Sequence, residues 1–495
     1  MKRSIALFVT LLAVSLFLAQ TRLAAEEKVA GTAPLDILAK YVYETKFGDF
    51  PPQAVTRAKY LILDNIGCAL GATQTDIGKN YLKLAHTLGG GQEARVIGSG
   101  EQVSCLAAAY VNAQLANVLD FDDTYDLYLP GHPGNAIVHT ALALSDAQGA
   151  SGQDMLAAVI LGYEVCLRAG KAAGNIDWQQ PFLYDVMSLG TITPAAHLLR
   201  LDLPGIRTAL LHADLTPFPF AKREKFDLLP TVNVTDLKNN AGYYAMAGIM
   251  AAHRADQGLA GWGNILSGDL KTWFLSGGDP ARYQLLTQGL GKEYLLLEVS
   301  FKPTPSCRLS HPAVTALWQA LDQKPVKADE VKEIIVKQVK RLDRPTWDRM
   351  LQAQFSLQCI VAMAALGVEP GPQWYITQRF NDPDVKGLAA KVKLEDDPQA
   401  EEMEITEGKG RCSVKVVFTD GTVKEAVIRA IKGAPDNPMS EKELQDKFRA
   451  NTRALFSESR LNRIIDTLLN LEKLPRVSTL TTLLTSPTLK TPSPH

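Results

Sequence analysis

The sequence predicts a mainly α-helical protein that carries a smaller, inserted α+β domain. Three observations predict this fold class. Helical periodicity runs from about residue 33 to 296, alternating strand patterns replace it from about 297 to 436, and helical periodicity returns over residues 437–484. The chain has 495 residues, of which 46% are hydrophobic and 21% are charged, so it can bury a sizeable core. We therefore expect a large all-helical domain, an inserted smaller α+β domain, and C-terminal helices that return to the first domain.

The first region begins its helices with residues typical of helix starts. Pro51 and Pro52 open a segment whose apolar residues recur every three or four positions, which gives one apolar face. Ser104 is the expected N-cap of a helix rich in small residues, which allow helices to pack closely. Ser151 and Asp154 approximate a capping box before another apolar helix. This region therefore predicts a set of packed helices.

The middle region changes to strand patterns. The segment "VKEIIVKQV", which starts at Val331, has the composition of a β-strand. The segment "CSVKVVFTDGTVKEAVIRAI" contains two alternating runs joined by Asp420-Gly421, which is a strong hairpin signal. A helical stretch, "SLQCIVAMAALG", lies between these strands. Ser440 and Glu443 then form another capping-box pattern, and the helical periodicity resumes there.

The two ends of the chain show signals of targeting and disorder. A basic start is followed by the apolar run "IALFVTLLAVSLFLA", which is too short to span a bilayer comfortably, and small residues near Ala25 suit cleavage. We expect residues 1–25 to be a signal peptide and the protein to be exported, either periplasmic or secreted. The mature form would then have no membrane segment; an uncleaved membrane anchor is the alternative. The Ser/Thr/Pro-rich residues 485–495 predict a disordered tail.

Charge and cysteine content argue against several kinds of partner. The chain has 52 basic and 53 acidic residues, so its charge gives no basis for binding nucleic acid. Its six cysteines are scattered and form no C-x-x-C pair, which removes the usual zinc and iron–sulfur signatures. Disulfides are permitted in an exported protein, but buried free thiols are the interpretation that we favour.

The stretch "LDFDDTYDLYLPGHPGNA", residues 119–136, has four aspartates within seven residues and then a Gly-His-Pro-Gly turn. Such a cluster can bind a metal ion, solvate a loop, or place a carboxylate beside an imidazole for proton transfer. Its "DDTYD" segment has the pattern with which terpene synthases hold magnesium and diphosphate. The second metal motif that such enzymes need is not found, and the histidine would stay unexplained. We interpret three aspartates as residues that cap and solvate the loop, namely Asp122, Asp123 and Asp126.

Several segments, taken in order, resemble the MmgE/PrpD family. They are "PPQAVTRAKYLILDNIGCALGA", "ANVLDFDDTYD" with "GHPGNA", "LGYEVCLR", "FKPTPSCRLSHPAV", "AQFSLQCIVAMAAL", "DPDVKGLAAKV", "FTDGTVKEAV" and "NPMSEKELQDKF", over roughly residues 33 to 485. The family includes 2-methylcitrate dehydratase, cis-aconitate decarboxylase and an iminodisuccinate epimerase. The resemblance implies the two-domain fold expected above, with the inserted α+β domain as a lid domain, a homodimer, a small di- or tricarboxylate substrate, and activity without a metal or organic cofactor.

The resemblance also implies a set of catalytic residues. Asp120 matches the first aspartate of the family's DFDDT motif, His132 matches the histidine of its HPSG-like turn, and Lys302 matches its active-site lysine. Removing a proton from carbon next to a carboxylate needs a base in reach and cations that hold the developing charge. We expect His132 to be the general acid/base, oriented by Asp120, and Lys302 to stabilise negative charge. Lys171 is a candidate second proton-transfer group, and an exposed lysine on a Pro-rich linker is the alternative for Lys302.

Three further residues are candidates for substrate binding. Arg308 would grip a substrate carboxylate through two parallel hydrogen bonds, and a structural salt bridge is the alternative. His311 would line the substrate site or pack beneath it at a helix start. Lys238 aligns loosely with another lysine of the family.

Two departures from the family pattern bear on the reaction. Lys171 stands where the decarboxylase-type members have a histidine, and Gln358-Cys359 replaces a proline-tyrosine pair. Because these changes disfavour cis-aconitate decarboxylation, we predict a cofactor-independent lyase or isomerase, with dehydration of the 2-methylcitrate type first. The site should lie between the helical domain and the lid, where closure excludes water. The alternatives are a non-catalytic, exported carboxylate-binding homologue and a magnesium-dependent terpene synthase.

Overall fold

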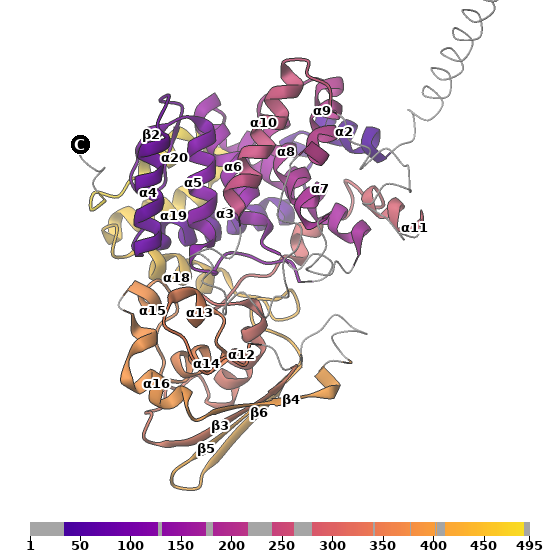
Figure 1. Ribbon diagram of the computed structural model, residues 1–495. Helices are drawn as coiled ribbons and strands as arrows, with labels where there is room; N and C mark the ends of the chain where they lie inside the picture. Colours follow the sequence, from indigo (N-terminus) through magenta and orange to yellow (C-terminus); the bar gives the residue numbers. More distant parts are fainter. Residues whose placement is uncertain are drawn as a thin grey trace, which may run out of the picture.

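The computed structural model describes residues 34–126, 131–174, 182–215, 240–261, 280–339, 342–376, 378–400, 402 and 411–489. Within these residues the chain forms a large helical domain and a smaller α+β domain that lies along one side of it (Figure 1). This arrangement confirms the fold class predicted from the sequence. The expected signal peptide, residues 1–25, and Lys238 lie outside the described residues.

Most of the helical domain comes from the first part of the chain. Its helices are α2 (Pro34–Glu44), α3 (Pro52–Ala72), α4 (Asp76–Leu88), α5 (Cys105–Val118), α6 (Pro133–Gln148), α7 (Gly152–Ala173), α8 (Phe182–Leu198), α9 (Leu203–Leu211), α10 (Ala241–Asp256) and α11 (Pro280–Tyr283), with 3₁₀ turns η1 (Phe47–Asp49), η2 (His212–Leu215), η5 (Gln284–Leu286) and η6 (Leu295–Glu298). A short hairpin of β1 (Ala94–Arg95) and β2 (Gln102–Val103) joins α4 to α5. The α8 and α10 helices approach so closely that a Cβ on Gly248 would lie 2.5 Å from the carbonyl carbon of Thr191. Small residues are therefore required where these helices cross.

The helices begin where the capping patterns predicted. The Ser104 Oγ accepts a hydrogen bond from a backbone N–H in the first turn of α5. Ser151 and Asp154 form a reciprocal capping box at the start of α7. The first turn of α3 contains Pro52, whose missing N–H would have had no partner inside the helix.

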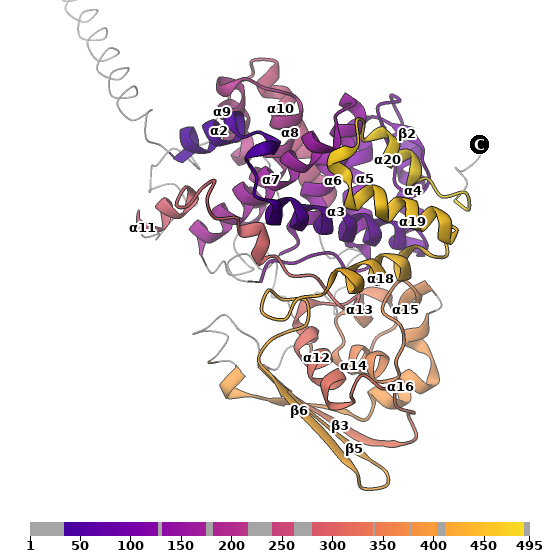
Figure 2. The same ribbon diagram turned by 180° about the vertical axis from the view of Figure 1, so that it is seen from behind.

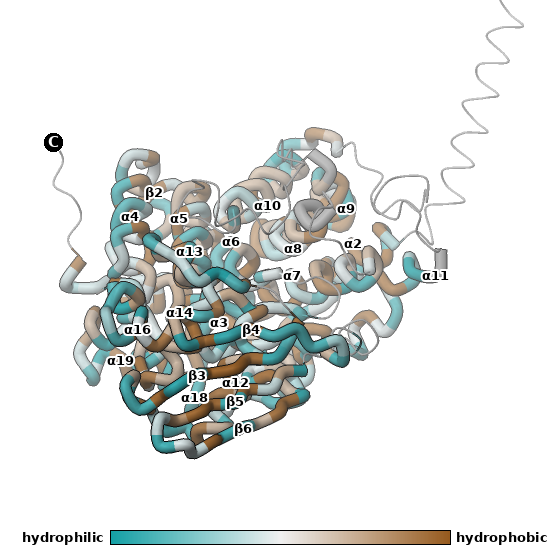
Figure 3. Tube along the Cα trace, turned by 60° about the horizontal axis from the view of Figure 1, so that its bottom comes forward, coloured by the Kyte–Doolittle hydropathy of each residue, from teal (hydrophilic) through white to brown (hydrophobic). Residues whose placement is uncertain are grey.

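The α+β domain consists of a four-stranded sheet with helices packed on it. Its elements are η7 (Arg308–Ser310), α12 (His311–Ala320), β3 (Val331–Gln338), α13 (Met350–Gln354), α14 (Leu357–Ala365), α15 (Gln373–Ile376), η8 (Arg379–Asn381), α16 (Pro383–Ala389), β4 (Val392–Asp396), β5 (Cys412–Phe418) and β6 (Val423–Ile428). The strand order is β4-β3-β5-β6, with β3 and β4 parallel and the other pairs antiparallel. Gly421, at φ +89°, makes the predicted turn between β5 and β6. Apolar and polar residues are interspersed along the strands, as expected for a sheet with one covered face (Figure 3).

The chain returns to the helical domain after β6. The returning helices are α18 (Glu441–Thr452), α19 (Glu458–Leu469) and α20 (Ser478–Leu483), with the turn η9 (Leu471–Lys473). The α18 and α19 helices pack against α3, and α18 lies where the two domains meet (Figures 1 and 2). The Phe448 ring fills the space beside Gly67, where a Cβ would lie 2.8 Å from it. The two ends of the chain thus complete one domain.

Residues 485–489 lie on the helical domain, although the sequence analysis assigned them to a disordered tail. The Ser486 N–H donates to the Gly98 carbonyl at 2.7 Å, and the Ser486 hydroxyl donates to the Leu455 carbonyl at 3.1 Å. A polar, Pro-containing sequence can therefore still be ordered where backbone groups of a neighbouring loop bind it. Residues 490–495 lie outside the described residues.

The structure also shows the state of the six cysteines and the lengths of the described helices. All six cysteines are buried and form no disulfide, which confirms the interpretation as free thiols. Among the helices of the described residues, none is both long enough and apolar enough to cross a membrane.

Candidate active site

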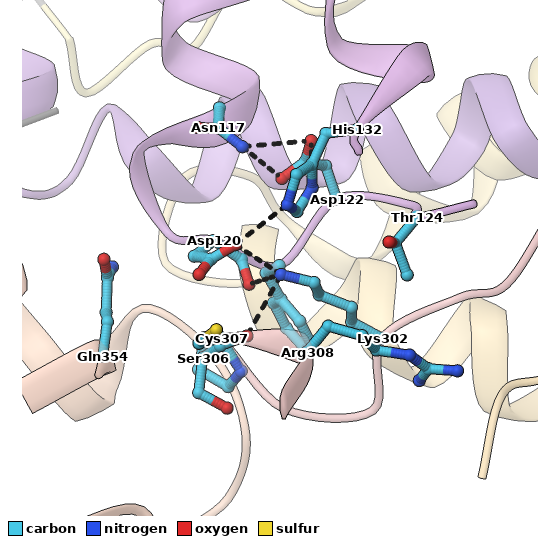
Figure 4. Close-up of polar contacts among 12 residues, drawn as sticks. Asn117, Asp120, Asp122, Thr124, His132, Lys302, Ser306, Cys307, Arg308 and Gln354 are labelled. Carbon is cyan, nitrogen blue, oxygen red and sulfur yellow. Dashed lines mark hydrogen bonds and ion pairs between the residues drawn. The ribbon is translucent and has the colours of Figure 1, made fainter. Parts of the chain in front are cut away.

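Four charged side chains meet where the helical domain contacts the α+β domain (Figure 4). They are Asp120, Asp122, His132 and Lys302, and we refer to them as the charged cluster. The three residues other than His132 are 0% exposed, and His132 is 6% exposed. The structure therefore brings Lys302 next to Asp120 and His132, although Lys302 lies 182 residues after Asp120 in the sequence.

Backbone pairing explains how these distant segments come together. Thr124 and Ser300 form an antiparallel bridge, with N–H to carbonyl distances of 2.9 and 2.7 Å. The segment that leads to Lys302 is thereby fixed beside the segment that starts at Asp120. A second bridge, between Tyr125 and Gly131, turns the chain back so that His132 faces the same cluster.

Asp120 has an unusual backbone. It follows the C-terminus of α5 at φ +50°, a left-handed conformation that usually requires glycine or asparagine. Its N–H donates to the Asn117 carbonyl at 2.9 Å. Its carboxylate accepts a hydrogen bond from Lys302 and lies 3.4 Å from His132 Nε2. Local strain of this kind is commonly found at functional sites, where the surrounding structure holds it.

His132 lies between two carboxylates. It is the N-cap residue of α6, and Pro133 starts the helix immediately after it. While Asp120 approaches its Nε2, the Oδ2 of Asp122 lies 3.2 Å from its Nδ1. Burial opposes ionisation of Asp122, yet the charge of His132 keeps the pKa of Asp122 below its usual range. Two carboxylates around one ring favour the imidazolium form.

Lys302 is held as a buried ammonium. Its Nζ donates to the Asp120 carboxylate, to the Asp120 carbonyl at 2.8 Å and to the Ser306 carbonyl at 3.1 Å. These three acceptors match the three N–H donors of an ammonium. The structure thus contradicts the alternative of an exposed linker lysine.

Residues of the α+β domain hold the loop that follows Lys302. The Tyr375 hydroxyl donates to the Pro305 carbonyl, and the Cys307 N–H donates to the Gln354 carbonyl at 3.0 Å. The Gln354 side chain also donates to the Val118 carbonyl at 2.9 Å, which links the α+β domain to the end of α5. Burial raises the pKa of Tyr375 well above its usual value, with a contribution from Cys359. A phenol therefore lies near Cys359, although the sequence lacks the family's tyrosine at that position.

Arg308 forms a structural salt bridge, which was the alternative to its predicted role in binding a substrate carboxylate. Its Nε and Nη2 lie 3.0 and 2.7 Å from the Asp126 carboxylate, which also accepts a hydrogen bond from Ser300 at 2.8 Å. The structure therefore gives the Arg308 guanidinium an internal carboxylate partner. Burial opposes ionisation of Asp126, but Arg308 keeps the pKa of that carboxyl below its usual range.

His311 packs beneath the Lys302 loop. Its Nδ1 lies 3.2 Å from Arg308 Nη1 and its Nε2 lies 3.3 Å from the Ser306 hydroxyl. Because a guanidinium can only donate, Nδ1 accepts and Nε2 carries the hydrogen. Burial, together with the charges of Arg308 and Lys302, lowers the pKa of His311 well below its usual value. A neutral His311 thus supports Ser306, whose carbonyl accepts from Lys302.

Lys171 is not part of the charged cluster as described. It is partly buried in the last turn of α7. It follows Tyr163, whose hydroxyl donates to Asp123 beside the cluster, by eight residues. Eight residues correspond to about 12 Å along a helix. Lys238 falls outside the described residues.

The interpretation of Asp122, Asp123 and Asp126 as solvated loop residues was wrong for the first two. Asp122 and Asp123 are both 0% exposed. Asp123 accepts hydrogen bonds from the Asn65 side chain and the Tyr163 hydroxyl, each at 2.9 Å. The available signal was Asn65 itself, a polar residue inside the apolar face of α3.

The cluster also has the donor set of a metal site. Oxygen and nitrogen atoms of Asp120, Asp122 and His132 lie within 4.8 Å of one another. However, the Lys302 ammonium already occupies the cation position beside Asp120. The arrangement of the described residues therefore fits an ammonium better than a metal ion.

Fold and site together define a class of protein. A buried carboxylate, imidazole and ammonium between a helical domain and an α+β domain are suited to moving protons on an anionic substrate. Residues 36–280 match the MmgE/PrpD N-terminal domain and residues 304–473 match the MmgE/PrpD C-terminal domain. The chain belongs to the MmgE/PrpD family.

Similar proteins of known activity agree with this assignment. The chain is 27% identical to cis-aconitate decarboxylase of Mus musculus over 476 residues, which cover 91% of this chain and 93% of the mouse protein. It is 27% identical to the human enzyme of that name, with 91% and 94% covered, and 25% identical to that of Aspergillus terreus, with 89% and 93% covered. Decarboxylases of this kind are lyases, so these relatives confirm the class of enzyme expected.

Proposed function

We propose that the protein is a cofactor-independent lyase that decarboxylates a small, unsaturated tricarboxylate of the cis-aconitate type. The observation that carries this proposal is the buried contact of Asp120, His132 and Lys302. Lys302 is a cation and His132 becomes one on protonation, and positive charge attracts a polyanionic substrate. Burial strengthens their effect because water does not screen them.

The reaction follows from what such groups supply. A carbon–carbon bond breaks, carbon dioxide leaves, and the electron pair stays on a carbon conjugated with a neighbouring carboxylate. The Lys302 ammonium stabilises the negative charge that develops on the carboxylate oxygens. His132 then gives its proton to the carbon, so each turnover consumes one proton.

The pairing of His132 and Lys302 with carboxylates favours decarboxylation over dehydration, which was the first prediction from the sequence. His132 and Lys302 each lie against carboxylates, which hold their protons in place. A decarboxylase needs such a donor, whereas a dehydratase also needs a base. Dehydration of the 2-methylcitrate type is the second candidate. Its support is the Asp120 carboxylate, a base next to an acid, and the departures at Lys171 and Cys359 from the decarboxylase pattern.

A substrate panel tests the proposal directly. The purified protein is incubated with cis-aconitate, with 2-methylcitrate and with other di- and tricarboxylates, and products are followed by proton NMR together with released carbon dioxide. We expect an unsaturated C5 dicarboxylate from cis-aconitate, unaffected by EDTA. Water loss from 2-methylcitrate with no carbon dioxide would establish the second candidate. Binding in calorimetry without any product would establish the carboxylate-binding alternative, and magnesium-dependent turnover of a prenyl diphosphate the terpene synthase.

Removal of the imidazole tests the role of His132. His132→Ala should lower kcat by roughly a hundredfold or more, because general acid catalysis contributes about that factor. The matched control is His86→Ala, which removes a histidine that is exposed on α4 and paired with Glu101. Circular dichroism checks that both variants fold. Near-normal turnover in folded His132→Ala protein would exclude His132 as the proton donor.

A further inference from the structure

The two carboxylates beside His132 differ in what else they contact. Asp120 lies 3.4 Å from Nε2 and also binds the Lys302 ammonium, so a second cation partly neutralises its charge. Asp122 lies 3.2 Å from Nδ1, and His132 is its partner among the described ion pairs; Lys302 also lowers the pKa of Asp122, but by less than His132 does. The field of Asp122 therefore acts on the ring with less cancellation than that of Asp120.

Asp122 is also the more firmly held of the two. Asn117, near the end of α5, donates to its Oδ1 at 2.9 Å, and Asn135, in the first turn of α6, donates to its Oδ2 at 3.0 Å. All three residues are at most 4% exposed and belong to the helical domain. Asp120, in contrast, has a strained backbone and takes its cation from the start of the α+β domain.

The other charged groups described near His132 do not contact its ring as Asp122 does. Asp123 and Asp64 lie in the same buried region of the helical domain, where Asp123 is held by Asn65 and Tyr163 and Asp64 pairs with Lys447 at 2.6 Å. Neither is described in contact with the His132 ring. The charges that face the ring are those of Asp120, Asp122 and, through Asp120, Lys302.

We propose that Asp122 is the positioning residue of His132: it orients the ring through Nδ1 and holds it in the imidazolium form. From the family resemblance, Asp120 was the residue predicted to orient His132. Asp120 then has a different role. Its carboxylate pairs with Lys302 and lies on the Nε2 side of His132, where an anionic substrate group would bind. The catalytic meaning of this assignment rests on the proposed function, but the charge of the ring is measurable without turnover.

Histidine NMR tests the assignment. The protein is labelled with ¹⁵N-histidine, the His132 signals are identified by their loss in His132→Gln, and their pH titration is compared between variants. In Asp122→Asn the titration midpoint should fall by about one pH unit or more, a tenfold change in the acid constant. Removing Asp120 and Lys302 together, in Asp120→Asn/Lys302→Met, should lower the midpoint by less, because the opposite charges of this pair partly cancel at the ring.

Two further variants serve as controls. Asp123→Asn removes an adjacent carboxylate that is equally buried but does not contact the ring, so the His132 midpoint should stay at the wild-type value. Asp122→Glu keeps the charge and should hold the midpoint above that of Asp122→Asn; it also provides the test if Asp122→Asn does not fold. A His132 midpoint that is unchanged in Asp122→Asn, or that falls further in Asp120→Asn/Lys302→Met, overturns the proposal.

Turnover separates this inference from the proposed function. Asp122→Asn should lower kcat with little change in KM and move the alkaline loss of activity to lower pH. If no substrate reacts but the midpoint falls as expected, the inference stands and the proposed function fails. If cis-aconitate reacts but the midpoint does not move, the inference alone fails.

Discussion

Asp123 is a buried carboxyl group whose hydrogen-bond donors, Asn65 and Tyr163, are both neutral. Burial, together with the neighbouring charge of Asp122, raises its pKa to about 7 from an ordinary value of 3.8. The folded protein therefore keeps a proton on Asp123 at a pH where the unfolded chain has released it. The stabilising contribution of this group is complete below about pH 4 and is lost as the pH rises through about 7.

Asp123→Asn should make folding stability less dependent on pH. An amide stays neutral at every pH, so the variant should gain a few degrees in Tm relative to wild type at pH 8 but not at about pH 4. Thermal unfolding by circular dichroism at the two pH values measures this difference. The control is Asp446→Asn on the exposed side of α18, which should shift both values equally. If the Tm of Asp123→Asn also changed by the same small amount at both pH values, the Asp123 carboxyl group would not carry a raised pKa.

The charged residues could be predicted only in part from the sequence. Asp120, His132 and Lys302 were identified because each lies in a motif, and the structure brings them together. Asp122 and Asp123 were misassigned because their burial depends on Asn135, Asn65 and Tyr163, which lie in other helices. A run of aspartates in a loop gives no sign of such partners. The two alternatives for Arg308, a substrate carboxylate or a structural salt bridge, could be distinguished only by the position of Asp126 beside it.

At the scale of secondary-structure elements, the start of α7 is fixed by the returning C-terminal segment. The Gly152 N–H donates to the Leu474 carbonyl at 2.8 Å, and the Val477 N–H donates to the Ala150 carbonyl at 2.9 Å. A Cβ on Gly152 would lie 1.7 Å from the Leu471 carbonyl oxygen. The backbone of one segment therefore leaves room for glycine alone in the other.

Gly152→Ala should destabilise the protein, since backbone atoms must move to admit the methyl group. Overpacking of this kind costs about 1–3 kcal/mol in the free energy of unfolding. Gly387→Ala is the matched control, because Gly387 lies in α16, is exposed, and has no atom near the position of a Cβ. It should stabilise by roughly 0.5–1 kcal/mol. Denaturant titration measures both changes, and equal stability of the two variants would contradict the packing described here.

The elements themselves were largely predictable where their signals are local. The helix starts at Ser104 and Ser151 and the β5–β6 turn at Gly421 depend on residues within a few positions of one another. The parallel pairing of β3 with β4 was not predicted, because it joins segments more than fifty residues apart and is fixed by packing on α12 and α14. Residues 485–489 were misassigned for the same reason.

At the scale of the whole molecule, the N-terminal segment predicts export. When the full chain is expressed in a bacterial host, we expect the protein to leave the cytoplasm and to lose about 25 residues, because its apolar run has the length of a signal peptide. Cell fractionation and intact mass spectrometry measure the two effects. A chain that lacks residues 1–25 should stay in the cytoplasm. Recovery of the uncut chain in the membrane fraction would indicate the anchor alternative.

The helical domain is assembled from both ends of the chain, with the whole α+β domain between them. A ribosome therefore releases α3 long before α18 and α19, the helices that cover it. Domains usually fold as units while synthesis proceeds, but here the larger domain must wait for the last residues to emerge. Until then its apolar helices stay uncovered, and the nascent chain can still be threaded through a narrow channel or bound by a chaperone.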